Sequence, residues 1–532
     1  MQLVHIFPIK NLLCLAAVAL TACAQLPPPS QGKLSPQALE MVSRSHLPDQ
    51  TSELQRQQWL DRITWGATDH DAARLQQQGL KMWLAAQLTP STSPMPAEVQ
   101  QRIDALTISQ KHMAQIQREI AEQRKAIRST QDADEAAQLR QDLQRQLNQL
   151  SSDAQKRHIW RALYSQHQLQ EQMTWFWMNH FNVSTRKGDV RMWVGDYEEQ
   201  AIRPHALGNF RDLLAASMRH PAMLLYLDNA SNAAGRINEN YARELLELHT
   251  MGVGSGYTQA DVQAMAHVLT GLGFSTRDAD APPPKLRPER QAEYFRQGFF
   301  EFNPARHDYT PQVLLGKPLK KSGMAQVNEA LERIVATPAT AHFIARKLAV
   351  FFLGDNPAPA AVERTAQTFA RSHGDIAATL ASLLTAPEAQ RFGQRFKDPM
   401  HYVLGTTRLA YDQRIASDVG PIQGWLNQLG QPLYGHETPD GYPQAQTDWS
   451  SSGQLMNRFT VAQQIGTRGA VLFRSNAREP LEKPPYPDFK QRLSVQARLP
   501  ALSPATRAAL AQAKNPADWN TYFLSAPEMM FR

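Results

Sequence analysis

Histidine, carboxylate and arginine side chains cluster in the middle of the chain, where they could transfer protons or bind a divalent metal ion. The densest run is NENYARELLELHTMG, residues 238–252. Side chains of the same types recur nearby, in segments rich in apolar and aromatic residues. We therefore consider seven candidate catalytic residues: His180, Arg203, Glu244, Glu247, His249, His307 and Asp308.

The run 238–252 predicts a helix of about three turns, with Asn238 as the N-cap and Gly252 after the last turn. At 100° per residue, the buried face would carry Tyr241, Leu245, Leu248 and His249. Two interpretations fit this composition. The polar residues could form a buried Arg–Glu–His network that fixes helix packing, or they could converge with His180 and His307-Asp308 on a catalytic or metal site.

A divalent metal such as Zn, Mn or Fe would have to be held by nitrogen and oxygen ligands, but no known metal motif is present. HExxH is absent, and Leu246 stands where a Glu-x-x-His pair ending at His249 would need a glutamate. The segments 235–239 and 248–250 are loosely similar to animal-type haem peroxidases. Their spacing differs and no proximal histidine segment follows, so haem is not expected.

Four of the remaining histidines are expected to be structural, and one lies in a turn-rich loop. His205 and His220 are expected to cap or pack helices, and His267 and His342 lie in alanine-rich helices where a structural role is expected. The turn-rich loop GHETPDGYP, residues 435–443, could line a cleft with three polar side chains. These are His436, Glu437 and Asp440.

The N-terminus predicts an exported lipoprotein. Residues 1–22 have the form of a signal peptide, in which Lys10 precedes an apolar run too short to span a bilayer. The run ends in LTAC, which resembles the lipobox of bacterial lipoproteins and implies diacylation of Cys23. A proline-rich tether is expected over residues 23–52. Alanine after the cysteine favours the outer membrane in a Gram-negative cell, so the protein would sit lipid-anchored in the periplasm or at the cell surface.

Composition excludes several classes of protein. The 532 residues contain only two cysteines, Cys14 and Cys23. One leaves with the signal peptide and the other would carry lipid, so the mature chain has no disulfide, thiolate metal site or cysteine nucleophile. The net charge of +7 is mild for this length, and there is no Lys/Arg-rich run. Nucleic-acid binding is not expected.

The helical pattern predicts a mainly α fold, with one large multi-helix domain over residues 53–532 and few or no strands. Residues 98–161 are polar and predict a long helical hairpin insertion, broken near Ser129–Asp134. Residues 322–392 predict amphipathic helices separated at Thr337-Pro338, Asn356-Pro357 and 372–374. Residues near 300–319 suggest a short hairpin or an irregular segment.

Several segments follow one another along the chain in the order typical of a known family. They include 60–88, 175–181, 202–210, 220–229 and, most specifically, 238–252. Together they resemble the bacterial family DUF1800, a domain of unknown function, from about residue 55 to residue 530. The resemblance implies a mostly exported helical protein, often encoded beside a partner of the DUF1501 family, and it supplies no reaction. Two departures are a longer polar insertion and Tyr442 in place of an expected tryptophan.

Two functions are consistent with these features. The first is a surface-anchored enzyme that acts on envelope or extracellular substrates by metal-dependent or acid–base chemistry at the candidate residues. The alternative is a non-catalytic lipoprotein that binds an exported partner through the polar helical arm.

Overall fold

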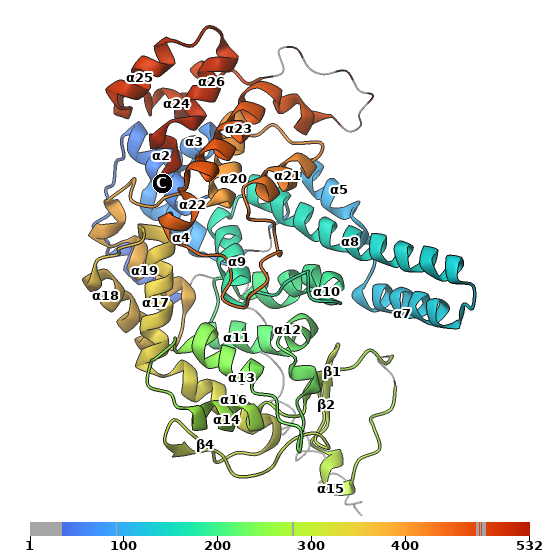
Figure 1. Cartoon of the computed structure of the whole chain (residues 1–532). Helices are drawn as coiled ribbons and strands as arrows, with labels where there is room; N and C mark the ends of the chain where they lie inside the picture. The colour runs from blue at the N-terminus through green and yellow to red at the C-terminus, as the bar shows by residue number, and fades with distance from the viewer. Residues whose placement is uncertain are drawn as a thin grey trace, which may run out of the picture.

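A computed structural model describes residues 35–532, except for residues 92, 279–280, 475–477, 479, 481–482 and 484–485. The described chain is mainly α, as the sequence predicts (Figure 1). The predicted signal peptide, residues 1–22, and Cys23 lie outside the described residues. No helix among the described residues is long and apolar enough to cross a membrane.

The N-terminal helices pack on the body, and the first of them corrects the predicted tether. The tether was expected to extend to residue 52, but α1 lies within it and contacts α4 and α19. Its residues Ala38 and Val42 are buried in the core. The prediction of a tether is therefore wrong for α1, because burial of these apolar side chains favours a packed helix. The helices of this region are α1 (Pro36–Ser43), α2 (Glu53–Ile63), α3 (Asp69–Gln78), α4 (Leu80–Leu88), α5 (Ala97–Asp104) and α6 (Thr107–Gln110).

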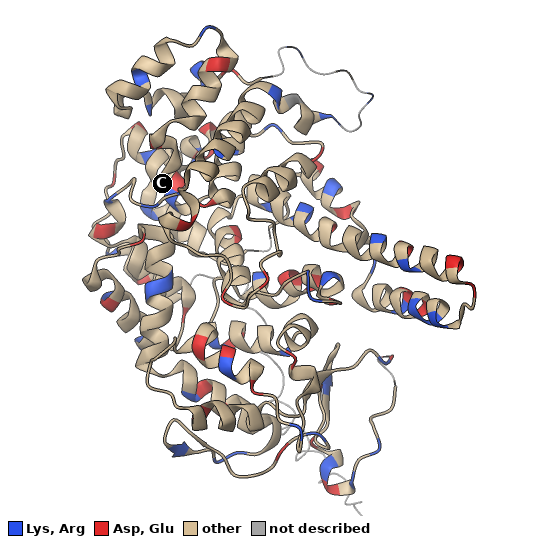
Figure 2. Ribbon diagram, in the orientation of Figure 1, with Lys and Arg blue, Asp and Glu red and all other residues tan. Residues whose placement is uncertain are grey.

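A long helical hairpin extends from the body, formed by α7 (Met113–Ser129) and α8 (Ala133–Tyr164) (Figure 1). Asp132 caps α8 at the predicted break, since its carboxylate accepts from the first-turn amides. Both signs of charge alternate along the hairpin (Figure 2). The C-terminal half of α8 is buried in the body, so the insertion ends before residue 161. Arg124 pairs with Asp189 of α10 (Val190–Asp196) at its N-cap, which docks the hairpin on the body.

Helix α9 (Gln168–His180) runs through the centre of the molecule, and every residue of it except Asn179 is buried. It contacts the N-terminal helices α2 and α4, and the C-terminal residue Arg532 donates to the Gln172 side chain at 3.2 Å. Around it lie the π-helix η1 (Tyr197–Ile202), the 3-10 turn η2 (Arg203–His205), α11 (Phe210–Arg219), α12 (Pro221–Tyr226) and the 3-10 turn η3 (Asn229–Ser231).

The next region carries the densest candidate run and the only strands among the described residues. The strands form two small antiparallel sheets, in the orders β1-β3-β2 and β4-β5. The expected short hairpin is therefore present. The elements are α13 (Asn240–Glu244), the π-helix η4 (Leu245–Thr250), α14 (Gln259–Val268), β1 (Leu272–Phe274), α15 (Pro288–Gln291), β2 (Phe295–Gln297), β3 (Phe300–Phe302), β4 (Val313–Leu314) and β5 (Lys317–Pro318).

The C-terminal half is helical, and its helices break where the sequence predicts. Thr337 caps α17 ahead of Pro338, which is tolerated in a first turn. The helices are α16 (Gly323–Val335), α17 (Pro338–Leu353), α18 (Pro359–Arg371), α19 (Ile376–Leu384), α20 (Pro399–Tyr411), α21 (Gly420–Gln428), α22 (Gln446–Trp449), α23 (Ser452–Arg468), α24 (Leu493–Gln496), α25 (Pro504–Ala511) and α26 (Pro516–Ser525). Short 3-10 turns η5 to η9 lie between or after them, at Pro387–Gln390, Gly469–Phe473, Phe489–Gln491, Leu499–Ala501 and Pro527–Met530.

A close backbone approach joins the N-terminal helices to α20. Gly66 has φ +134°, and a Cβ there would lie 2.5 Å from the Cα of Gly405. Arg408, one turn further along α20, donates from Nε to the Gly66 carbonyl at 3.0 Å and pairs with Asp71 at 2.5 Å. The buried guanidinium can bind both partners only because the two glycines let the segments touch.

Gly66→Ala should therefore lower the free energy of unfolding by about 2 kcal/mol or more, since it adds backbone strain and a clash. Gly79→Ala is the matched control: its φ is +76°, but a Cβ there meets nothing within 4 Å. Strain alone should cost it about 1 kcal/mol. Urea denaturation measures both, and equal losses would mean that the contact with Gly405 is unimportant.

Candidate functional site

The run 238–252 folds as α13 followed by the π-helix η4, and this corrects the predicted three-turn α-helix. Burial repeats every four residues, since the pairs 241–242, 245–246 and 249–250 are buried. The wider turn moves Leu248 off the buried face that an α-helix would give it and brings Leu246 in. His249 stays buried as predicted. The helix ends where Gly252 donates its N–H to the Leu246 carbonyl at 3.1 Å.

Two of the candidate residues, His180 and His249, meet in the core. His180 ends α9, and its Nε2 donates to the carbonyl of His249 at 3.0 Å. The two imidazole ring centroids lie 6.1 Å apart. Burial and the positive charge of Lys347 lower the pKa of His249 to about 3. The same two causes hold the pKa of His180 well below its ordinary value, so both rings are neutral near pH 7.

Several buried polar atoms around this pair lack hydrogen-bond partners among the described residues. They are Nδ1 of His180, both ring nitrogens of His249 and the hydroxyl of Tyr241. Tyr241 is 1% exposed, and its ring centroid lies 6.2 Å from that of His249. Unpaired buried polar groups are uncommon because each one costs free energy. Their concentration here marks this part of the core as a candidate functional site.

A cavity of about 290 Å³ lies beside the histidine pair. It is lined by Lys347 and Phe343 of α17 and by residues 440–444. Burial lowers the pKa of Lys347 to about 8, although the carboxylate of Asp440 raises it. No hydrogen bond or ion pair joins Lys347 to another described residue, and its ammonium lies 5.5 Å from the Phe343 ring centroid. The cavity is therefore lined by an amine whose pKa burial lowers below that of an ordinary lysine.

The loop 435–443, predicted to line a cleft, supplies the opposite wall of this cavity. Asn179 anchors the loop to α9: its amide donates to the Tyr442 carbonyl at 2.9 Å, and its side-chain oxygen accepts from the Tyr442 amide at 2.7 Å. A Cβ on Gly441 would overlap the Asn179 carbonyl, so the close approach requires glycine. The loop thereby places Asp440 at the cavity, while His436 bonds within the loop to Thr438 at 2.9 Å.

The candidates Glu244 and Glu247 lie near this loop. Burial and the negative charges of Glu247 and Asp440 raise the pKa of Glu244 above its ordinary value. Glu247 pairs with Arg243, four residues earlier, at 3.5 Å between Oε1 and Nη1. The structure therefore brings four of the seven candidates, His180, Glu244, Glu247 and His249, into one neighbourhood.

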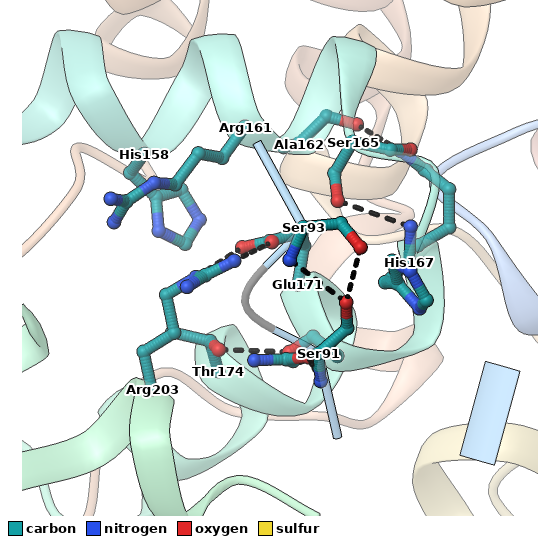
Figure 3. Close-up of polar contacts among 12 residues, drawn as sticks. Ser91, Ser93, His158, Arg161, Ala162, Ser165, His167, Glu171, Thr174 and Arg203 are labelled. Atoms are coloured by element: carbon teal, nitrogen blue, oxygen red, sulfur yellow. Dashed lines mark hydrogen bonds and ion pairs between the residues drawn. The ribbon is translucent and has the colours of Figure 1, made fainter. Parts of the chain in front are cut away.

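Arg203 belongs to a different cluster. Its Nη2 and Nε lie 2.7 Å and 3.2 Å from the two carboxylate oxygens of Glu171, a bidentate pair seen in Figure 3. Burial lowers the pKa of Arg203, but the charge of Glu171 raises it above its ordinary value. Glu171 is nine residues from His180 in α9, which places the two side chains about 14 Å apart along the axis. The prediction that Arg203 shares a site with His180 is wrong.

The Arg203 cluster is the buried Arg–Glu–His network expected for residues 238–252, but it joins α8, α9 and η1 instead. Glu199 accepts from Arg161 at 2.6 Å, and Glu198 lies 2.9 Å from Nδ1 of His158. Burial alone would raise the pKa of Glu199, yet the arginines lower it to about 2. Because its members are paired with each other, the network fixes helix packing.

His307 and Asp308 bind the end of α14, away from the histidine pair. His307 Nδ1 donates to the Thr270 carbonyl at 2.8 Å. Asp308 Oδ2 lies 2.6 Å from Nδ1 of His267, the histidine expected to be structural. No contact joins either residue to His180 or His249 among the described residues. Their inclusion in one convergent site is wrong, because both side chains are engaged locally.

A metal centre gains no support from this arrangement. Among the described residues, no group of three or more His, Cys, Asp and Glu side chains is placed to hold a metal ion. The histidine pair offers two imidazoles behind the cavity wall, and the charged side chains that line the cavity are Arg346, Lys347 and Asp440. Proton transfer fits these side chains better than metal binding.

The family model described as "Protein of unknown function (DUF1800)" matches residues 58–531. The chain belongs to the DUF1800 family. No curated protein and no solved structure matches it. The DUF1800 match covers the histidine pair, Lys347 and the anchored loop, so all of the candidate site lies within the family domain.

Sequence reasoning missed three residues of this DUF1800 site: Asn179, Tyr241 as a polar group, and Lys347. Asn179 directly precedes His180 in the WFWMNHF segment, and its polar side chain among aromatic residues was a usable signal. Lys347 lies in the apolar stretch IARKLAVFFL. A lysine inside such a stretch is unusual and also gave a signal, because charged residues are rarely buried.

The stability of this DUF1800 protein should depend on pH through His249. The folded protein keeps the ring neutral down to about pH 3, whereas the unfolded chain binds a proton below about pH 6.5. The unfolded state therefore holds more protons in this window, and stability falls as the pH falls from about 6.5 toward 3.

His249→Leu should reduce that dependence by about 1.4 kcal/mol per pH unit between about pH 5.5 and 4. Urea denaturation at several pH values measures the slope. His342→Leu, which removes an exposed histidine of α17, is the control. If both variants keep the slope of the unsubstituted protein, His249 is not a neutral buried group.

Proposed function

We propose that the protein is an exported lipoprotein whose helical body carries an acid–base site, with Lys347 as the group that transfers the proton. Its substrate would be a small polar molecule that enters the cavity beside α17. Burial would keep the amine partly unprotonated near neutral pH. His180 and His249 would support the cavity wall from behind, as neutral rings whose unpaired nitrogens could bind a water.

The observation that carries this proposal is Lys347 itself, which faces the cavity of about 290 Å³ with no ion pair among the described residues. Its pKa of about 8 suits general acid–base work, since transfer is most efficient when the pKa lies near the operating pH. Asp440 lines the same cavity and could bind a donor group of the substrate. The cavity is small, which restricts the substrate or the part of it that enters.

The docked hairpin favours the cavity over the polar arm as the functional feature. Arg124 and Arg191 tie α7 and α8 to α10 and its N-cap, through Asp189, Gln144 and Asn148. The large apolar side chains exposed elsewhere in the described chain are not found on this hairpin. A surface that is polar on all sides and held to the body gives a partner little apolar area to bury.

Location remains the second part of the proposal, and it rests on the sequence. The LTAC segment supports lipidation of Cys23, and the residue after it supports the outer membrane of a Gram-negative cell. Two acyl chains would give stable anchoring. Residues 24–34 would then lead from the anchor to α1.

Lys347→Met should abolish any activity of the site, with a loss of about a hundredfold or more. Purified protein would be tested on chromogenic esters, phosphomonoesters, glycosides and peptides. A reporter turned over at this site should show a rate that rises with an apparent pKa of about 8. Lys321→Met, at an exposed lysine, is the control.

Competitive acetylation read by mass spectrometry tests the amine without a substrate. Lys347 should react half-maximally near pH 8, against about 10.4 for an ordinary lysine. An ordinary midpoint, together with no turnover that depends on Lys347, would refute the acid–base proposal.

Cys23→Ser should abolish incorporation of an alkyne-labelled fatty acid and release the protein from the membrane fraction of the cell. Cys14→Ser changes the other cysteine, within the predicted signal peptide, and should leave labelling and fractionation intact. Labelling that survives Cys23→Ser would show that the anchor has been misassigned.

A further inference from the structure

A second, larger cavity lies open at the surface of the C-terminal helices, and the acid–base proposal does not use it. It has a volume of about 600 Å³ and lies between α25, α26 and the turn η8 (Leu499–Ala501). Leu502 and Leu510 line its wall, and the buried ring of Trp519 stacks on Phe523 at 5.3 Å between centroids. These side chains give the cavity an apolar lining.

The rim of this cavity is cationic. Lys490, Arg507 and Lys514 line it and are exposed, whereas no aspartate or glutamate lines it. Neither lysine forms an ion pair among the described residues, and the Lys490 ammonium lies 5.5 Å from the Trp519 ring centroid. Arg507 donates from Nη1 to the Leu502 carbonyl at 2.5 Å, which holds the guanidinium beside the opening.

The charges of the surrounding chain are mixed. From residue 488 to residue 532 the chain has six Lys and Arg against three Asp and Glu, but Arg492 and Arg498 pair with Asp412 and Asp61 at 3.4 Å and 2.7 Å. Asp518 accepts from the backbone amide of Lys514 at 3.3 Å and Glu528 from Ser503 at 2.7 Å, and neither carboxylate lines the groove. The cationic character therefore belongs to the rim itself and not to the whole region. Figure 2 shows basic positions on the helices at this end of the molecule.

We propose that this groove between α25 and α26 binds an anionic phospholipid of the membrane surface, with an acyl chain on the apolar lining and the phosphate against the three cations. Charge complementarity selects an anion, and the apolar floor selects one that carries a hydrocarbon chain. Exposed lysine and arginine side chains are also the groups that an anionic membrane surface attracts. Leu493, 62% exposed at the start of α24, adds an apolar side chain near η8.

The proposal assumes the membrane location proposed above, but its test does not use the lipid anchor. Protein that begins at residue 24 contains every described residue and would be sedimented with vesicles. The vesicles are made of phosphatidylcholine alone or with added phosphatidylglycerol. We expect binding to the anionic vesicles only, and binding that weakens as salt is added. A failure of Cys23→Ser to release the protein would leave this result unaffected.

Reversal of the three rim charges, with Lys490→Glu, Arg507→Glu and Lys514→Glu together, should weaken vesicle binding by about a hundredfold. The matched control reverses three exposed lysines around β5: Lys317→Glu, Lys320→Glu and Lys321→Glu. It changes the net charge equally and should change binding by only a few-fold. Equal losses in the two triple variants would overturn the proposal in favour of unspecific attraction.

Leu499→Gln tests the apolar lining of the groove independently of the charged rim. It places a polar group on the half-buried lining and leaves the charge unchanged. It should weaken binding to anionic vesicles, with circular dichroism confirming that the variant is folded. Unchanged binding would show that no acyl chain enters the groove. Tight binding to a glutamate-rich peptide, without binding to anionic vesicles, would instead identify an acidic protein partner and overturn the lipid assignment.

Discussion

The burial of helix α9 is the constraint on which the rest of the structure depends. A polar side chain inside a protein must find a hydrogen-bond partner, and α9 is polar along much of its buried length. Most polar residues of α9 therefore bond to a segment outside the helix. Gln168 bonds the amide of Trp65, Gln170 the amide of Ser91, Glu171 the side chain of Arg203, Gln172 the carbonyl of Thr64, and Asn179 the backbone of Tyr442. Segments from residue 64 to residue 442 are thus positioned by one helix, and the apolar core closes around these contacts.

Much of the fold could be predicted from local signals. Thr337-Pro338 marked a helix start, and the polar stretch after residue 98 marked a hairpin whose turn is capped by Asp132. These features depend on residues a few positions apart, which is the range over which capping and amphipathic periodicity act. The π-helix η4 was not predictable in the same way. Nothing in the periodicity of residues 238–252 separates a repeat of four from one of 3.6 over two turns, so the residues of the buried face were only partly correct.

The candidate site could be predicted only in part, because residue types show which side chains could do chemistry but not which of them meet. Residue types identified His180 and His249, which do meet, but the same types identified Arg203 and His307, which do not. Which of them meet is decided by contacts between residues 32 or more positions apart, such as the pair of Arg203 with Glu171 and the bond from His180 to the carbonyl of His249. Arg203 was drawn to Glu171 because a buried guanidinium needs a carboxylate, and Glu171 is the carboxylate that α9 offers. Lys347 was not predicted, because the cavity that it lines is formed together with the loop 435–443, which is distant in the sequence.

Helix α9 connects the candidate site to the core. The polar side chains at its N-terminal end are paired, whereas several polar atoms at its C-terminal end have no partner. At the N-terminal end, Glu171 is paired with Arg203 and Gln168 with the amide of Trp65. These pairs hold that end of the helix rigidly against its neighbours. At the C-terminal end, His180 has one ring nitrogen engaged and His249 has none, although both rings are buried. Because α9 also anchors the loop that carries Asp440, the cavity cannot change its width without disturbing Asn179. A substrate that entered would meet Lys347 and Asp440 at a spacing already set by the core. Preorganisation of this kind would let the proposed amine, Lys347, act in a site that needs no rearrangement to form.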